Sequence, residues 1–240
     1  MAPRKPLLQH LSSENNEAWM GLIDGVYAVA MTMIAIELPG LVLSLIQVPN
    51  EARELAPLTA IITYEFIAYI ATFLILYELW SFHKSILLLA RLSRRNQNLI
   101  NGFILAVTCL GAGNTIVILK AKTEAVSEAL SQGATHSQLM QDWLGSTEQF
   151  GLITFLIVAG SYGLLAALAR QSKTTKSASD LLSLERSSWR RGVLFLALIT
   201  LWSPLLMGSQ QPLLPPAPVV VGYLIATHIR SGNFQPPTNH

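Results

Sequence analysis

Apolar residues are gathered into six long segments of the chain, and polar stretches separate these segments. Most of the segments hold roughly 20 mainly apolar residues, the length an α-helix needs to cross the hydrocarbon core of a bilayer. Strands of a membrane barrel would be about 10 residues long and would alternate between apolar and polar positions. The pattern therefore predicts an all-α integral membrane protein, with six transmembrane helices in a single domain over residues 1–240. The expected helices cover 19–38, 58–82, 99–119, 150–168, 192–207 and 213–229.

Prolines stand at two of the expected helix ends. Pro39 and Gly40 follow the first segment and should end its helix, although a further apolar stretch comes directly after them. The sixth segment is short and begins with Pro215, Pro216 and Pro218. The first turn of a helix tolerates proline because the missing N–H has no intrahelical partner there.

Lysine and arginine residues are unevenly divided between the two sides that six spans define. If the N-terminus is cytoplasmic, thirteen of the sixteen fall in inner segments, and only Arg53, Lys120 and Lys122 fall in outer ones. Short cytoplasmic loops of membrane proteins carry an excess of these residues. The distribution predicts a multi-pass protein of the plasma or inner membrane with both termini in the cytoplasm.

Composition narrows the classes of partner and site. The chain is 51% hydrophobic and 12% charged, about half the charged share of soluble domains. A net charge of +2 gives no indication of nucleic-acid binding. Cys109 is the one cysteine, so neither an intrachain disulfide nor a cysteine metal cluster can form. No cofactor and no resident metal are expected, and the polar N-terminal stretch does not have the pattern of a signal peptide.

The first segment has two neighbouring stripes when it is drawn as a helix with about 100° per residue. Small residues form one stripe, and Gly21 and Gly25 make its narrowest part, where another helix can approach closely. Val29, Met33 and Ile36 form the adjacent stripe of larger apolar residues. Ordinary helix packing would also explain a stripe of small residues.

Asp24 is an ionisable residue inside this first segment. Placing a carboxylate within a membrane helix costs roughly 2.5–3.5 kcal/mol on insertion scales. The wheel turns Asp24 away from the large apolar stripe and toward neighbouring helices. Either it belongs to a structural polar network, or it lies near the cytoplasmic interface in contact with water. Candidate partners at the same depth are His83, Lys84, Asn98 and Asn101, whereas Trp80 is typical of an interfacial anchor.

Glu37 stands at the opposite end of the first segment. A carboxylate at the outer mouth of a pore would concentrate cations there. A capping or solvated interfacial glutamate is an equally good interpretation of the same position.

The run from Asp24 to Pro39, DGVYAVAMTMIAIELP, resembles the first helix of the endosomal–lysosomal potassium channel family named transmembrane protein 175, in particular its prokaryotic branch. Trp80 and His83 are similar to a tryptophan and histidine at the end of that family's second helix, and Asn101 is similar to an asparagine that opens its third.

The resemblance implies a homotetrameric, potassium-permeable cation channel whose four first helices surround a central pore. It also implies an apolar constriction at Val29, Met33 and Ile36, with Thr32 beside it. Carried over in the same way, Asp24, His83 and Asn101 belong to a structural polar network. Potassium ions, lipid and further copies of the chain are the partners that this reading predicts, and a ring of apolar side chains can gate by dewetting.

Three positions depart from the family pattern. Ala18, Leu22 and Ile23 replace the family's arginine, phenylalanine and serine, so the family's polar network cannot form here in the same way. Val29 stands where isoleucine is common, and the proposed neck should therefore be slightly wider.

Two other functions fit parts of the sequence. A small secondary transporter would use broken helices and mid-membrane ionisable residues, for which Pro204, Glu65 and Glu78 are candidates. A membrane enzyme is not expected because the chain has no recognisable nucleophile elbow or zinc motif. A structural or assembly protein would also be compatible with the stripes of the first segment.

Overall fold

The computed structural model describes residues 16–46, 55–90, 92, 94–132, 138, 148–173, 177–208 and 216–231. These residues form six α-helices, each of which overlaps one of the six predicted segments. The helices are α2 (Asn16–Ile46), α3 (Leu55–Leu89), α4 (Arg95–Ser131), α6 (Glu148–Gln171), α7 (Ala178–Gly208) and α8 (Pro216–Ser231).

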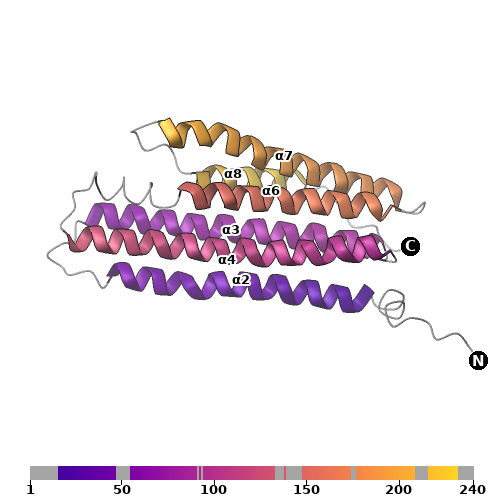
Figure 1. Cartoon of the computed structure of the whole chain (residues 1–240), viewed down its shortest axis with the longest axis horizontal. Helices are drawn as coiled ribbons and strands as arrows, with labels where there is room; N and C mark the ends of the chain where they lie inside the picture. Colours follow the sequence, from indigo (N-terminus) through magenta and orange to yellow (C-terminus); the bar gives the residue numbers. More distant parts are fainter. Residues whose placement is uncertain are drawn as a thin grey trace, which may run out of the picture.

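The helices lie side by side along the long axis of the molecule, as Figure 1 shows. Helix α2 forms one edge of the bundle and packs on α3 and α4. Helix α7 forms the opposite edge and packs mainly on α6, while α8 packs on α3. Helix α3 is therefore the central element, since it contacts every other helix of the bundle.

Four of the helices are long and apolar enough to cross a membrane: the spans 17–37, 62–89, 95–129 and 152–171 within α2, α3, α4 and α6. The part of α8 that is described in full, Pro218–Thr227, is a shorter apolar helix. The chain is thus a multi-pass membrane protein by the length and composition of these helices.

Several helices are longer than their apolar segments. Helix α4 extends to Ser131 because Lys, Glu and Ala residues that follow the apolar part are good helix formers. Helix α7 begins at Ala178, well before the apolar residues, with Asp180 in its first turn where the helix dipole favours a negative charge. A hydrophobic pattern predicts only the part of a helix that contacts lipid. The predicted ranges are therefore shorter than the observed helices.

The helix predicted to end at Pro39–Gly40 continues to Ile46, so that predicted boundary is wrong. The apolar stretch that follows, LVLSLI, extends the same helix beyond the proline. Likewise, α7 continues past Pro204 to Gly208, which removes the break that a transporter interpretation would have used.

Close helix packing occurs where glycine faces another helix. A Cβ atom added at Gly192 of α7 would lie 3.3 Å from the carbonyl oxygen of Ala159 in α6. A Cβ atom at Gly111 of α4 would lie 3.0 Å from a methyl carbon of Ile157. Such contacts let the α4–α6–α7 part of the bundle pack tightly, as small residues do in membrane helices.

Candidate functional site

Helix α2 presents one narrow face to the bundle. Ile23, Tyr27, Ala30 and Ile34 recur at helical spacing and are buried against α3 and α4. This spacing of four, three and four residues keeps the four side chains on one side of the helix. The buried face fixes which residues of α2 point outward.

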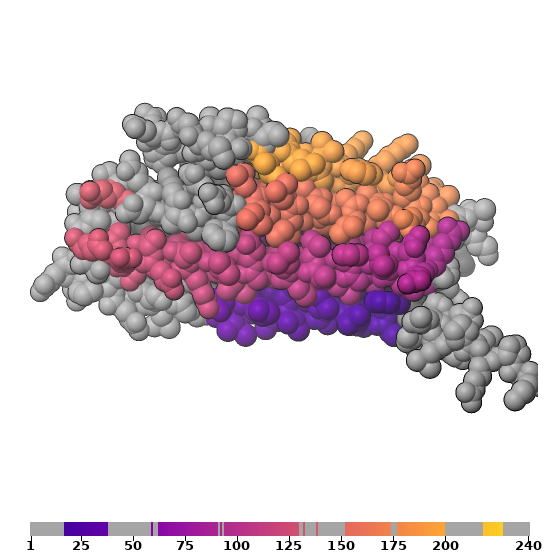
Figure 2. All heavy atoms as spheres, in the orientation of Figure 1, coloured from indigo at the N-terminus to yellow at the C-terminus, as the bar shows by residue number. Residues whose placement is uncertain are grey.

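The predicted pore residues lie on the outward face of α2. Val29 is 60% exposed, Met33 is 48% exposed and Ile36 is 69% exposed in the single chain. Thr32 is also exposed and donates its hydroxyl hydrogen to the Ala28 carbonyl oxygen at 2.7 Å. Figure 2 shows α2, in indigo, along one edge of the molecule.

The stripe of small residues is exposed as well. A Cβ atom added at Gly21 or Gly25 would meet nothing within 4 Å. The close approach that these glycines allow is therefore not used by any helix of the same chain among the described residues. It remains available to a helix of another chain.

Other helices also expose large apolar side chains, so exposure alone does not distinguish a pore from a lipid-facing surface. Phe103 and Leu110 of α4, Phe66 and Phe73 of α3 and Val193 of α7 are further examples. A water-soluble protein rarely exposes this much contiguous apolar surface. Helix α2 has a stripe of exposed small residues beside its large apolar residues, and α4 has a similar one at Gly102, Ala106 and Cys109.

Asp24 is held by α3. The indole N–H of Trp80 donates a hydrogen bond to Asp24 Oδ1 at 2.7 Å, and the Lys84 ammonium group lies 3.0 Å from Oδ2. The same ammonium group lies 4.8 Å from the centre of the Trp80 ring. The three residues form a compact group that fixes the rotation of α2 against α3, with the carboxylate turned away from Val29 and Met33.

His83 and Asn101 form a second group between α3 and α4. His83 Nε2 lies 2.6 Å from Asn101 Oδ1, and both residues are fully buried. Because the amide oxygen only accepts, His83 must carry its hydrogen on Nε2. The His83 ring also meets the edge of Tyr27, with 6.1 Å between ring centres.

The predicted polar network is thus divided into two. Asp24 contacts Trp80 and Lys84, whereas His83 contacts Asn101, and no hydrogen bond joins the two groups within the described residues. Trp80, expected only as an interfacial anchor, proves to be a direct hydrogen-bond donor to Asp24. Ala18 and Ile23, where the family has polar residues, take no part because neither side chain can form a hydrogen bond.

Glu37 is paired at the other end of α2. Its carboxylate lies 3.0 Å from the ammonium group of Lys120 on α4. Both side chains are partly exposed, so the pair is in contact with solvent and contributes little to stability.

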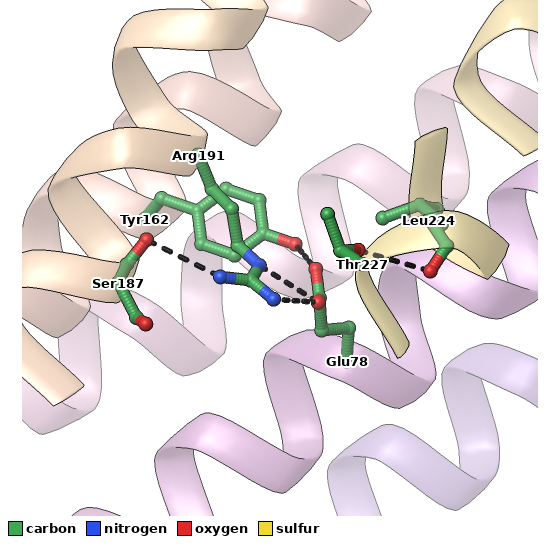
Figure 3. Close-up of polar contacts among 6 residues, drawn as sticks. All are labelled: Glu78, Tyr162, Ser187, Arg191, Leu224 and Thr227. Atoms are coloured by element: carbon green, nitrogen blue, oxygen red, sulfur yellow. Dashed lines mark hydrogen bonds and ion pairs between the residues drawn. The ribbon is translucent and has the colours of Figure 1, made fainter. Parts of the chain in front are cut away.

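A third polar group, which the sequence did not indicate as a unit, lies between α3, α6 and α7 (Figure 3). Arg191 donates from Nε to Glu78 Oε1 at 2.7 Å, and the Tyr162 hydroxyl donates to the other carboxylate oxygen. The guanidinium group also lies 4.7 Å from the Phe82 ring. The sequence contained one signal for this group, the carboxylate of Glu78 within the second apolar segment, but nothing that identified its partners on distant helices.

Comparison with known families identifies one match. Residues 20–111 match the family described as Endosomal/lysosomal potassium channel TMEM175. The matched region contains most of α2, all of α3 and the first half of α4, and so includes the Asp24 and His83 groups. No curated protein and no solved structure matches the chain.

Proposed function

Since residues 20–111 match a potassium channel family, we propose that this chain forms a potassium-permeable cation channel in the plasma or inner membrane. Four copies surround one axis, and α2 of each copy lines the pore. All six helices cross the bilayer, and both termini are cytoplasmic. Conduction is passive, and the partners are potassium ions, lipid and the other copies.

The observation that carries this proposal is the exposure of Val29, Met33 and Ile36 on a helix whose small-residue stripe is also open. Two adjacent uncovered stripes suit a helix that packs closely on its symmetry mates and turns bulky residues toward the axis. Three rings, each made of four such residues, would narrow the pore with apolar side chains. A narrow apolar constriction tends to lose its water, and ions cannot pass while it is dry.

Thr32 supplies the polar atom nearest to this neck. Its hydroxyl hydrogen is committed to the Ala28 carbonyl oxygen, so its oxygen lone pairs are the groups that can meet a partly dehydrated cation. Glu37, one helical turn beyond Met33, is proposed to lie at the outer mouth, where its charge is balanced by Lys120.

The Asp24 group has a positioning role in this proposal. Trp80 and Lys84 hold the carboxylate on the α3 side of α2, which leaves the opposite side free for the pore. We propose that these two residues replace the polar network that the family forms with the residues absent at Ala18 and Ile23. The His83–Asn101 contact fixes α3 against α4 at the same end.

Potassium flux from liposomes tests the proposal. Val29→Trp is expected to abolish flux because it fills the neck, and Met33→Asn to raise it because the neck becomes polar. Val117→Trp, at an exposed position of α4, is the matched control and should leave flux unchanged. Equal flux in wild type, Val29→Trp and Met33→Asn, with all three folded, would show that this face of α2 does not line the pore.

A further inference from the structure

Glu65 is a buried acid in the outer part of α3, far along the helix from the Trp80 and His83 contacts. Its side chain is 1% exposed, and its Oε2 atom has no hydrogen-bond partner among the described residues. Its Oε1 atom lies 3.3 Å from the hydroxyl oxygen of Thr123 on α4. A fully ionised carboxylate with one buried, unpartnered oxygen is among the most costly groups a protein can contain.

The hydrogen bonds of Thr123 show where a proton must lie. The Thr123 hydroxyl oxygen is 2.9 Å from the Leu119 carbonyl oxygen, which can only accept. This shorter contact takes the one hydrogen that the hydroxyl group owns. A hydrogen bond between Thr123 and Glu65 then requires a hydrogen on Glu65, because two oxygens without a hydrogen between them repel each other.

The charged side chains around Glu65 do not supply a donor that could take the place of this proton. No salt bridge joins Glu65 to a basic side chain within the described part of the chain. On α4, Lys122 acts on Glu65 electrostatically, Glu124 is exposed, and Lys120 is paired with Glu37 of α2. The side chains described in the outer parts of α6, α7 and α8 include no charged residue. A more distant ammonium group lowers the cost of a carboxylate but leaves its second oxygen without a donor.

We propose that Glu65 is a proton-binding site that is occupied at neutral pH, and that its carboxylic acid donates a hydrogen bond to Thr123. The proton joins α3 to α4 near the outer side of the membrane. Glu65 and His83, which contact Thr123 and Asn101 of α4, are separated by about 27 Å along α3, close to the thickness of the hydrocarbon core. The site is therefore near the outer border, where protons can arrive from water.

Loss of the proton would loosen the outer end of α4. Thr123 lies one turn from Lys120, which holds Glu37 at the end of the described part of α2. External alkaline pH would therefore act on the mouth of the pore, a consequence that rests on the proposed function. The proton site itself does not depend on that function and is tested without measuring flux.

Infrared spectroscopy of the protein in liposomes provides the test, since a protonated carboxylic acid has a carbonyl band that a carboxylate lacks. At about pH 7, where an ordinary glutamate is ionised, we expect wild type to show this band and Glu65→Gln to lack it. Glu124→Gln, at an exposed position of α4, is the matched control and should keep the band. Thr123→Val should shift the band because the acid loses its acceptor.

Thermal unfolding gives a second, independent readout. Between about pH 5 and about pH 9, wild type should lose several degrees of melting temperature relative to Glu65→Gln, because only wild type can lose the proton that joins α3 to α4. Identical bands in wild type and Glu65→Gln, or parallel pH profiles, would overturn the proposal. Failure of Glu65→Gln to fold would overturn it too, since the amide keeps the shape and the donor of the protonated acid.

Discussion

Trp80 of α3 donates its indole N–H to Asp24 of α2 at 2.7 Å, so the acidic residue of the proposed pore helix is bound by an aromatic side chain of its neighbour. This bond, together with the Lys84 ammonium group, determines which side of α2 faces the bundle. The apolar stripe of α2 points outward because Asp24, on another side of the helix, is bound to α3.

Trp80→Phe should therefore weaken the protein without removing the aromatic packing. The variant removes one of the two donors to Asp24 Oδ1, which still accepts from Lys84 at 3.2 Å, and the carboxylate is partly exposed. We therefore expect a cost of about 0.5–1.5 kcal/mol of unfolding free energy, the net contribution of one hydrogen bond. Thermal unfolding in detergent measures the effect. Trp189→Phe, at an exposed tryptophan of α7, is the control and should change stability little. Equal stability of Trp80→Phe and wild type would mean that Lys84 alone holds Asp24.

The sequence predicted the outward stripe and its orientation relative to Asp24 because both depend only on the helical repeat. It placed Lys84 among the candidate partners of Asp24, which the structure confirms, but it also offered His83 and expected Trp80 only as an interfacial anchor. His83 and Lys84 are adjacent in sequence but point about 100° apart on α3, and only Lys84 reaches Asp24. Choosing between them requires the rotation of α3, which is set by packing on five other helices and cannot be read from one segment.

The Glu78–Arg191 pair shows the same limit. Glu78 lies in the second apolar segment and Arg191 at the start of the fifth, more than a hundred positions away. Neither position indicates the other as its partner. Hydrophobic periodicity predicts that such residues need partners, but not which helix supplies them. The helix count and the approximate spans, which need no such information, were predictable.

Arg191→Met should be strongly destabilising. It leaves Glu78, which is mostly buried, without a counter-ion, and removal of one partner of a buried pair costs about 3–5 kcal/mol. The double variant Glu78→Gln with Arg191→Met should recover much of this loss, because no uncompensated charge remains. Thermal unfolding of wild type, both single variants and the double variant gives the coupling energy. Strictly additive losses would show that the two side chains do not depend on each other.

Gly25→Leu should disturb assembly of the copies but not the folding of one chain. A side chain at this position meets open space within the chain, so only a neighbouring copy can be displaced by it. Light scattering of the detergent-solubilised protein should show tetramers for wild type and smaller species for Gly25→Leu. Gly160→Leu on α6 is the control, since its position is also open within the chain. Tetramers in both variants would remove the small stripe of α2 from the interface.

Lys120→Gln should raise cation flux at low ionic strength. In the wild type, the Lys120 ammonium group balances the Glu37 carboxylate 3.0 Å away, so the pair presents little net charge to an approaching ion. Removing the ammonium group leaves one uncompensated carboxylate per copy at the proposed outer mouth, which raises the local concentration of cations. The gain should shrink in about 1 M salt, where the screening length falls to about 3 Å. Potassium flux into liposomes at about 10 mM and about 1 M salt measures this difference.

Glu37→Gln should change flux in the opposite direction, and the double variant should resemble wild type. If Lys120→Gln gave the same flux as wild type at both salt concentrations, Glu37 would not lie at the mouth of the pore.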